Sequence, residues 1–142
     1  MRNDAPVLLV EDDAVDVGNV QRAFAKNGIG SPVYVVRNGE EAIAFLRGRT
    51  GSPHLARRPG LILLDLNMPM MDGFEFLAHI KHDEDLRKIP VVVLTSSHRC
   101  EDRVRSFELG AAGYILKPND SHAYVKLIET LDAYWTLSEL SY

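Results

Sequence analysis

Five short apolar runs, separated by longer segments with helical periodicity, constrain the fold of this chain more than any other feature. An apolar run of four or five residues, closed by turn residues, is typical of a buried strand. The expected strands occupy residues 6–10, 33–36, 61–64, 90–94 and 113–116. Because these runs are apolar at consecutive positions, both faces of the sheet that they form must be covered.

Helical segments fill the intervals between the expected strands. Residues 14–27 carry apolar side chains at helical spacing before Gly28, and Asn38 followed by Glu41 indicates a capping box that opens a second helix. The apolar positions that mark three further helices are Phe74, Leu77 and Ile80, then Val104 and Phe107, and finally Tyr124, Leu127, Ile128, Leu131 and Trp135. This alternation predicts an α/β fold, a doubly wound five-stranded parallel sheet of flavodoxin-like order 2-1-3-4-5 with helices on both faces.

Length and composition limit the chain to a few classes of protein. The 142 residues suit a single domain over 1–142 with an extended C-terminal helix, and too few residues follow that helix for a DNA-binding output domain. The net charge of -4 and the pI near 5.7 argue against binding to nucleic acid or to an anionic membrane surface, and no apolar stretch is long enough to span a bilayer. A single cysteine excludes an internal disulfide, which favours a cytoplasmic location.

The expected strands end in residues that carry a charge or a hydroxyl group. Glu11 and Asp12 follow the first strand, Asp65 the third, Thr95 the fourth and Lys117 the fifth. Because ligands of a parallel sheet bind at the carboxyl ends of its strands, these residues should meet at one edge. Two carboxylates about 5 Å apart repel by roughly 3 kcal/mol at an effective dielectric constant of about 20. The cluster therefore needs a cation, either Lys117 or a divalent metal, and oxygen ligands favour Mg²⁺.

Two interpretations of Asp65 are open. An isolated aspartate at a strand end is most often an Asx-turn residue, just as an isolated Lys117 would be a solvated charge before a proline. Complementary groups at four strand ends favour a functional site instead. The strand ends carry no histidine to activate a serine, and no glycine-rich phosphate loop follows the first strand. A carboxylate nucleophile beside Mg²⁺, with a hydroxyl and an ammonium group to hold phosphoryl oxygens, suits the acceptance of a phosphoryl group.

Four segments, in order along the chain, resemble the receiver domains of two-component response regulators. They are VLLVEDD, LILLDLNMPMMDG, IPVVVLTSS and GAAGYILKP, and the resemblance covers essentially the whole chain. It implies that Asp65 is the phosphoacceptor and that a sensor histidine kinase donates the phosphoryl group. It also implies that Asp12, Asp65 and the backbone carbonyl of Asn67 hold Mg²⁺, with Glu11 oriented through the waters of the metal.

The same resemblance implies a switch. Thr95 would hydrogen-bond to the phosphoryl group and Lys117 would pair with it, while Tyr114 would turn inward as Thr95 moves. The alternative for Tyr114 is an aromatic residue at the rim with its hydroxyl in water. The bond between Lys117 and Pro118 would be cis, as is usual in the family.

More narrowly, the chain resembles the single-domain regulators that serve bacterial and cyanobacterial phytochrome kinases. The segments RRPGLILLDLN and IPVVVLTSSH, the long loop before the third strand and a last helix that ends near AYWTL carry this resemblance. It implies a bacteriophytochrome as the kinase, and a homodimer through the fourth helix, the fifth strand, the fifth helix and the C-terminal end. The arginine-rich segment 47–60 is expected to be a surface loop that serves solubility or docking.

The alternative function is that of a Mg²⁺-dependent phosphatase or phosphotransferase with Asp65 as its nucleophile. Enzymes like the haloacid dehalogenases typically place a second aspartate two residues further on, where this chain has Asn67. The missing acid favours a signalling protein that is not an enzyme beyond its own phosphorylation and dephosphorylation. A receiver-like fold that takes no phosphate is a third alternative, disfavoured by the presence of Asp12, Thr95 and Lys117.

Overall fold

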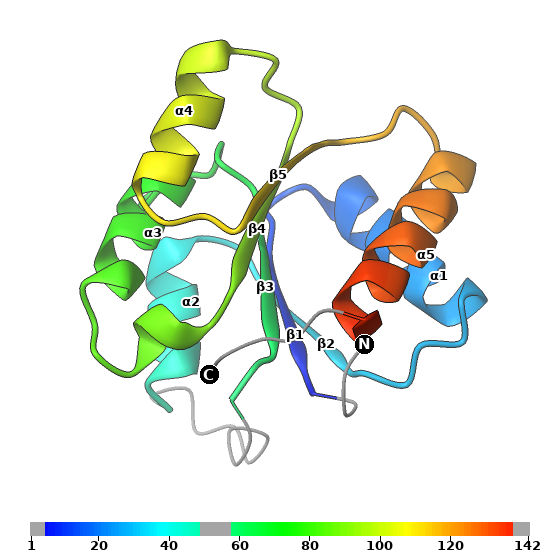
Figure 1. Cartoon of the computed structure of the whole chain (residues 1–142), viewed down its shortest axis with the longest axis horizontal. Coiled ribbons are helices and arrows are strands. Elements are labelled where there is room, and N and C mark those ends of the chain that lie inside the picture. The colour runs from blue at the N-terminus through cyan, green and yellow to red at the C-terminus, as the bar shows by residue number, and fades with distance from the viewer. Residues whose placement is uncertain (1–4, 49–57, 138–142) are drawn as a thin grey trace.

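Five parallel strands form the sheet that the sequence predicts, in the order β2-β1-β3-β4-β5 (Figure 1). The computed structural model describes residues 5–48 and 58–137. The strands are β1 (Val7–Val10), β2 (Val33–Val36), β3 (Leu61–Leu64), β4 (Val91–Thr95) and β5 (Gly113–Leu116). The helices are α1 (Ala14–Lys26), α2 (Gly39–Leu46), α3 (Gly73–Lys81), the short 3-10 helix η3 (Leu86–Lys88), α4 (Cys100–Glu108) and α5 (Ser121–Leu137). The predicted fold class and strand order are confirmed.

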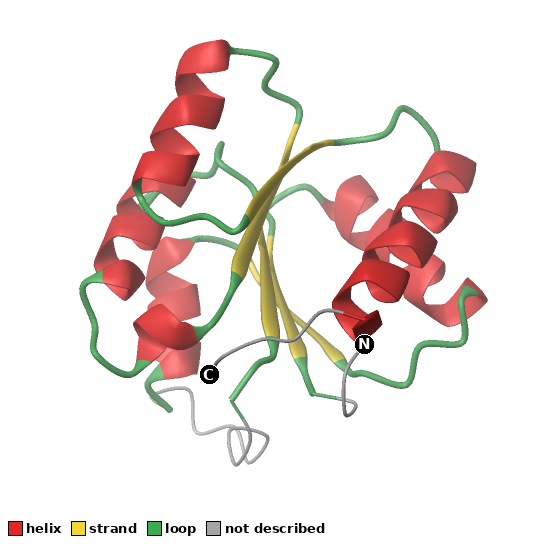
Figure 2. Cartoon of the chain, in the orientation of Figure 1, coloured by secondary structure: helices red, strands yellow, loops and turns green. Residues whose placement is uncertain are grey.

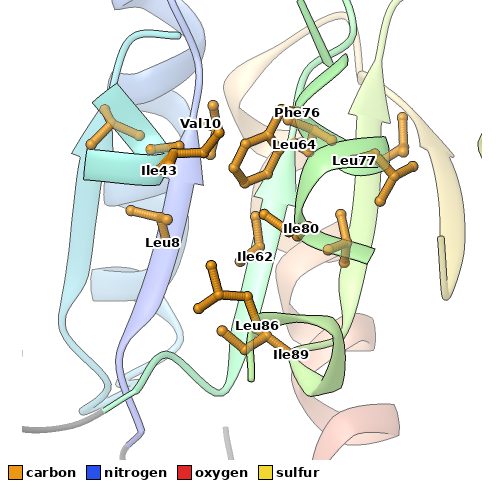
Figure 3. Packing of buried hydrophobic residues seen from close by; sticks show 14 of the residues in the cluster. Leu8, Val10, Ile43, Ile62, Leu64, Phe76, Leu77, Ile80, Leu86 and Ile89 are labelled. Carbon is orange, nitrogen blue, oxygen red and sulfur yellow. The ribbon is translucent and has the colours of Figure 1, made fainter. Parts of the chain in front are cut away.

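Helices cover both faces of the sheet: α1 and α5 lie on one face, and α2, α3 and α4 on the other (Figure 2). Successive residues of each strand point to opposite faces. Leu8 and Ile62 thus join the core under α2 and α3 (Figure 3), whereas Leu9 and Leu63 join the core under α1 and α5. Full burial of such a side chain contributes about 1.5–3 kcal/mol. Both cores fix the strands, and with them the residues at the strand ends.

Two strands begin one residue later than predicted, because a proline opens each predicted run. Pro6 and Pro90 have no N–H group to donate to a neighbouring strand. Their carbonyl oxygens still accept hydrogen bonds, from the N–H of Gly60 at 2.8 Å and from that of Ile62 at 3.0 Å. β4 also extends one residue beyond the predicted end, to Thr95, so that this residue belongs to the sheet.

Aspartate and asparagine side chains lie at the starts of α1, α2, α3 and α5, whereas the N-cap residue of α4, Arg99, makes no capping side-chain hydrogen bond. Asp13 caps α1, Asn38 caps α2, Asp72 caps α3, and Asp120 accepts an N–H group in the first turn of α5. The capping box predicted at Asn38 is half formed: its side chain accepts the backbone N–H of Glu41, but the Glu41 carboxylate contacts the Asn38 side-chain amide at 3.3 Å. Caps of this kind contribute about 1 kcal/mol each and fix the loops that follow β1 and β3.

The fourth predicted helix is confirmed as α4, but the two apolar residues that marked it do not face the core. Val104 and Phe107 of α4 are 45% and 48% exposed. Ser106 is fully buried instead, and its hydroxyl donates to the carbonyl oxygen of Asp102 at 2.7 Å. A serine can face the core in this way because the backbone of its own helix satisfies the hydroxyl. The two large apolar side chains therefore remain on the surface.

The apolar stripe predicted for the last helix is confirmed in α5. Its buried side chains are Tyr124, Ile128, Leu131 and Trp135. Tyr134 and Leu137, which do not belong to this stripe, are exposed. The predicted contacts of the C-terminal end beyond 137 lie outside the described residues. Within 5–48 and 58–137, no helix has the length and apolar character needed to cross a bilayer.

The arginine-rich segment is described only at its two ends, because residues 49–57 lie outside the described part of the chain. Both ends contact the turn that follows α3. Arg47 pairs with the carboxylate of Asp83 at 2.7 Å, and Arg58 donates to the carbonyl oxygen of Asp85 at 2.8 Å. These two arginines thus anchor the ends of the segment to the domain.

Gly73, the first residue of α3, lies against the backbone of the loop that carries Asp65. A Cβ atom at position 73 would lie 2.5 Å from the Asp65 carbonyl oxygen and 2.7 Å from the Cα of Leu66. Because backbone atoms cannot move aside easily, we expect Gly73→Ala to lower the free energy of unfolding by about 1–3 kcal/mol. In the control Gly18→Ala, the new Cβ meets only the flexible end of Arg22, and the helix should gain up to about 1 kcal/mol. Urea denaturation measures both, and a Gly73→Ala midpoint equal to that of wild type would contradict the close packing.

Candidate functional site

The carboxyl ends of β1, β3, β4 and β5 form one edge of the sheet, and the predicted polar residues meet there. Backbone hydrogen bonds extend the sheet past the strands: the N–H of Glu11 donates to β2 at 2.9 Å, that of Asp65 to β1 at 3.0 Å, and that of Lys117 to β4 at 2.8 Å. An open cleft of about 540 Å³ lies at this edge. It is lined by Glu11, Asp12, Asp13, Asp16, Asp65, Asn67, Ser96, Lys117, Pro118 and Asn119.

Asp65 is buried at the cleft and has one carboxylate oxygen without a partner. The residue is 5% exposed, and within the described residues its Oδ1 accepts no hydrogen bond. Its Oδ2 lies 3.6 Å from Nζ of Lys117. Burial raises the pKa of Asp65 above its ordinary value, against the opposing effects of the Lys117 charge and the Asn67 N–H. An unpartnered buried carboxylate oxygen is costly, so this atom favours a cation or another electrophile that enters from the cleft.

Lys117 supplies the positive charge of the site. Its Nζ lies 2.8 Å from Glu11 Oε1 and 2.8 Å from Asp16 Oδ2, both nearer than Asp65. Burial alone would lower the pKa of Lys117, but the hydrogen bonds to Asp16 and Glu11 outweigh it and raise the pKa. The ammonium group therefore remains charged. The expected cis bond between Lys117 and Pro118 is wrong: the described residues contain no cis peptide bond, and trans is the lower-energy form for most such bonds.

Glu11 is buried with both carboxylate oxygens engaged. One oxygen contacts Lys117, and the other accepts the backbone N–H of Asp13 at 3.1 Å. Burial raises the pKa of Glu11 to about 7, with the Asp65 charge adding to the effect and Lys117 opposing it. Because neither oxygen is free, Glu11 suits a contact with a metal through water better than direct ligation.

The oxygen donors of the cleft are compatible with a hard cation. Asp12 and Asn67 are exposed and line the same cleft as Asp65, whose Oδ1 has no partner. Carboxylate and carbonyl oxygens are the ligands that Mg²⁺ prefers, usually one or two together with water. Among residues 5–48 and 58–137, no three acidic, histidine or cysteine side chains converge as a complete metal cage. The donor set therefore fits an ion that keeps part of its water shell.

Two residues of the site were not identified from the sequence. Asp16 pairs with Lys117, and its Oδ1 accepts the hydroxyl of Tyr124 at 2.9 Å. Asp16 lies in the first turn of α1, so its position after the cap Asp13 could have indicated proximity to the strand ends. Tyr124 was assigned to the core, where a buried hydroxyl needs a partner. The need of this hydroxyl for a hydrogen-bond partner could have indicated that Tyr124 contacts a polar residue of the site.

Thr95 and Tyr114 both contact the loop between β4 and α4. Thr95 is fully buried, and its Oγ1 accepts the N–H of Ser97 at 3.3 Å. The Tyr114 hydroxyl donates to the carbonyl oxygen of Ser97 at 2.9 Å. In this structure Tyr114 is half-buried, with its hydroxyl bound to the loop rather than free in water. Ser97 therefore lies between the two predicted switch residues.

Known proteins match this chain over nearly its whole length. The family model described as the response regulator receiver domain matches residues 7–129. The response regulator Rcp1 of Synechocystis sp. is 40% identical over 129 residues, which cover 91% of this chain and 87% of Rcp1. Its Mn²⁺-bound structure matches with a TM-score of 0.84 and 38% identity over 97% of this chain and 99% of that chain.

Two further solved structures are similar. Phosphorylated RcpA, a cyanobacterial phytochrome response regulator, matches with a TM-score of 0.86 and 37% identity over 97% of this chain and 99% of that chain. The bacteriophytochrome response regulator AtBRR matches with a TM-score of 0.75 and 38% identity over 95% of this chain and 97% of that chain.

A doubly wound sheet with a buried aspartate, a threonine and a lysine at one edge defines a signalling domain of the response regulator type. The match to the family model and to Rcp1 makes the assignment specific. This chain belongs to the response regulator receiver family. The predicted membership is confirmed, and its relatives include regulators linked to phytochromes.

Proposed function

We propose that Asp65 accepts a phosphoryl group from a phosphohistidine of a sensor histidine kinase. The observation that carries this proposal is the unpartnered Oδ1 of a buried carboxylate that lines an open cleft, with Lys117 near its second oxygen. In the transfer, a carboxylate oxygen of Asp65 forms a bond to phosphorus while the bond between phosphorus and the histidine nitrogen breaks. The imidazole leaves with the electron pair of that bond, and the product is an acyl phosphate.

We further propose that Asp12, Asp65 and the backbone carbonyl of Asn67 bind Mg²⁺, with Glu11 acting through a metal-bound water. The all-oxygen donor set and the engagement of both Glu11 oxygens support this assignment. When bound, Mg²⁺ neutralises the negative charge of the phosphoryl oxygens. The relative Rcp1 has been crystallised with Mn²⁺, another hard divalent ion.

Thr95 and Lys117 are proposed to hold the transferred group. Because the Thr95 oxygen accepts a hydrogen bond from Ser97, its own O–H remains able to donate to a phosphoryl oxygen. Lys117 supplies a charge-assisted hydrogen bond. A movement of Thr95 would disturb Ser97, to which the Tyr114 hydroxyl is bound, and this contact is the proposed link to the switch.

The residue two positions after the nucleophile favours signalling over catalysis. Asn67 cannot act as the general acid and base that turnover of a substrate phosphate requires. We propose that the protein catalyses only its own phosphorylation and dephosphorylation, and that it signals through contacts with other proteins.

A phytochrome-type histidine kinase is the proposed phosphoryl donor. The similarity to RcpA and AtBRR, regulators linked to a cyanobacterial phytochrome and to a bacteriophytochrome, supports this choice. We place the exchange in the cytoplasm, where the exposed and unpaired Cys100 remains reduced.

Incubation with Mg²⁺ and acetyl phosphate, followed by intact mass measurement, tests the proposed function. We expect the wild-type chain to gain one phosphoryl mass only when Mg²⁺ is present. The Asp65→Asn variant, which keeps the size of the side chain but lacks the nucleophilic oxygen, should gain none. Labelling of the asparagine variant to the wild-type level would refute the assignment.

A homodimer through α4, β5 and α5 is the proposed output. The exposed large apolar residues of these elements, which we call the α4-β5-α5 surface, are Val104, Phe107, Leu116, Tyr134 and Leu137. Exposed large apolar side chains on elements at one edge of a sheet are typical of a protein interface. Tyr114 of β5 is bound to the loop before α4, so a change at Asp65 can reach this surface.

Sedimentation of Phe107→Glu tests the dimer. A charge on the α4-β5-α5 surface should convert the dimer to a monomer. Val35→Glu, on the edge strand β2 at the other end of the strand order, should not. A substitution is preferable to truncation after Ala133, because Trp135 is buried in the core. A wild-type chain that stays monomeric at high micromolar concentration, with and without a phosphoryl mimic, would exclude this interface.

A further inference from the structure

Lys117 is bound to two carboxylates other than the phosphoacceptor. Its Nζ lies 2.8 Å from Glu11 Oε1 and 2.8 Å from Asp16 Oδ2, but 3.6 Å from Asp65 Oδ2. The first two distances are those of charge-assisted hydrogen bonds, whereas the third is too long for one. Without a phosphoryl group, Lys117 therefore forms hydrogen bonds with Glu11 and Asp16 but not with Asp65.

Asp16 is itself held in place from α5. Its second oxygen, Oδ1, accepts the hydroxyl of Tyr124 at 2.9 Å. Tyr124 is 1% exposed, and its burial together with the hydrogen bond to Asp16 raises its pKa, so that the hydroxyl keeps its proton and donates. Asp16 also lies in the first turn of α1, where the helix dipole stabilises a negative charge. One carboxylate thus connects α1, α5 and the residue after β5.

Asp16 can release the ammonium group more easily than Glu11 can. The Glu11 side chain is 3% exposed, so the departure of Lys117 would leave a buried charge without its cation. The Asp16 side chain is 21% exposed, so water can replace the ammonium group. An acyl phosphate at Asp65 presents new anionic oxygens to Lys117. Movement of Nζ toward them breaks the contact with Asp16 first.

We propose that Asp16 positions Lys117 in the unphosphorylated protein and competes with the phosphoryl group for its ammonium. This role depends on the proposed phosphorylation of Asp65. When Lys117 moves to the phosphoryl oxygens, the Asp16 carboxylate keeps its bond to Tyr124 but loses its cation, and the change reaches the packing of α5 against α1. Asp16 acts through Lys117 and touches no reacting atom, so it is a positioning residue.

Equilibrium binding of beryllofluoride, a phosphoryl mimic, tests the competition. In the presence of Mg²⁺, we expect Asp16→Asn to bind beryllofluoride about tenfold more tightly than wild type, because one charge-assisted hydrogen bond no longer opposes the movement of Lys117. The asparagine oxygen still accepts the hydroxyl of Tyr124. A merely structural role predicts the opposite sign, since damage to the site weakens binding.

Asp72→Asn is the matched control. It removes one negative charge at the same edge of the sheet, keeps a good cap for α3 and makes no contact with Lys117. Its affinity should stay within about twofold of wild type, because water and salt screen an isolated charge. Tyr124→Phe, which removes only the hydroxyl that holds Asp16, should shift the affinity in the same direction as Asp16→Asn but by less.

Fluorine NMR of the bound mimic, with circular dichroism as a check of folding, gives the readout. Equal affinities of Asp16→Asn and Asp72→Asn, or weaker binding by folded Asp16→Asn, would overturn the positioning role. If Asp16→Asn does not fold, unchanged binding by Tyr124→Phe would overturn it. Failure of the wild-type chain to bind beryllofluoride would instead refute the phosphorylation site, and the role of Asp16 with it.

Discussion

Replacing Lys117 by methionine is expected to lower the free energy of unfolding by about 3–5 kcal/mol in Mg²⁺-free buffer, the usual cost of removing one partner from a buried ion pair. Lys117 is the cation that lies among Glu11, Asp16 and Asp65, and its side chain is 11% exposed. Without it, Glu11 and Asp65 would remain as buried carboxylates close to one another. Urea denaturation measures the loss, and Mg²⁺ should restore part of it by supplying another positive charge.

Lys81→Met is the matched control for this substitution. The Lys81 ammonium is also partly buried, but it donates to the carbonyl oxygens of Arg87 and Ile89 rather than to carboxylates. Its removal leaves no buried charge without a partner, so the free energy of unfolding should fall by only about 1–2 kcal/mol. If Lys117→Met cost no more than Lys81→Met, the electrostatic account of the cleft would be wrong.

Lys117→Arg tests whether a positive charge at position 117 is sufficient or whether the geometry of the lysine side chain is also needed. Lys117→Arg keeps the positive charge but presents a planar group with other hydrogen-bond directions. We expect phosphorylation of this variant to persist at a reduced rate, while the response of the α4-β5-α5 surface is lost. If phosphorylation changes the sedimentation of this variant as it does that of wild type, Lys117 is not part of the switch.

Asp12→Asn is expected to abolish the rise in melting temperature that Mg²⁺ causes in the wild-type chain. Metal affinity should fall by more than about 100-fold, since even changes outside the ligand set commonly cost about 10–100-fold. Without metal, the variant should be slightly more stable than wild type, because one negative charge near Glu11 is gone. Asp12 is exposed, so solvent screening keeps this gain below about 1 kcal/mol.

Asp85→Asn provides the comparison for the metal experiment. Asp85 is an exposed aspartate before β4, at the opposite edge of the sheet from the cleft, so its replacement should leave the Mg²⁺ response intact. An Asp12→Asn variant that kept the full Mg²⁺-dependent rise in melting temperature would contradict the proposed ligand set.

The strands and the edge at which they end could be predicted because their signals are local. Runs such as Leu61–Leu64 are apolar at every position, and such a run needs cover on both faces of a sheet. The residues that follow these runs reach the same edge in any parallel arrangement. The sequence alone therefore predicts that Asp65 and Lys117 lie close together.

The orientation of α4 and the role of Asp16 could not be predicted, because both depend on tertiary contacts. Val104 and Phe107 have the spacing of a buried face. However, the Ser106 hydroxyl is hydrogen-bonded within its own helix, so the face that carries Ser106 can be buried instead. Asp16 resembles a solvated residue of a helix that starts with several acids. Only the packing of α5 against α1 brings the Tyr124 hydroxyl to it.

Location of the phosphoryl group by peptide sequencing tests the central claim most directly. After reaction with acetyl phosphate and Mg²⁺, borohydride reduces an acyl phosphate of aspartate to homoserine, which tandem mass spectrometry assigns to one position. We predict homoserine at position 65 alone, in proportion to the phosphoryl mass of the intact chain. Homoserine at Asp12 or another carboxylate, with an unmodified Asp65, would contradict the assignment of Asp65 as the phosphoacceptor.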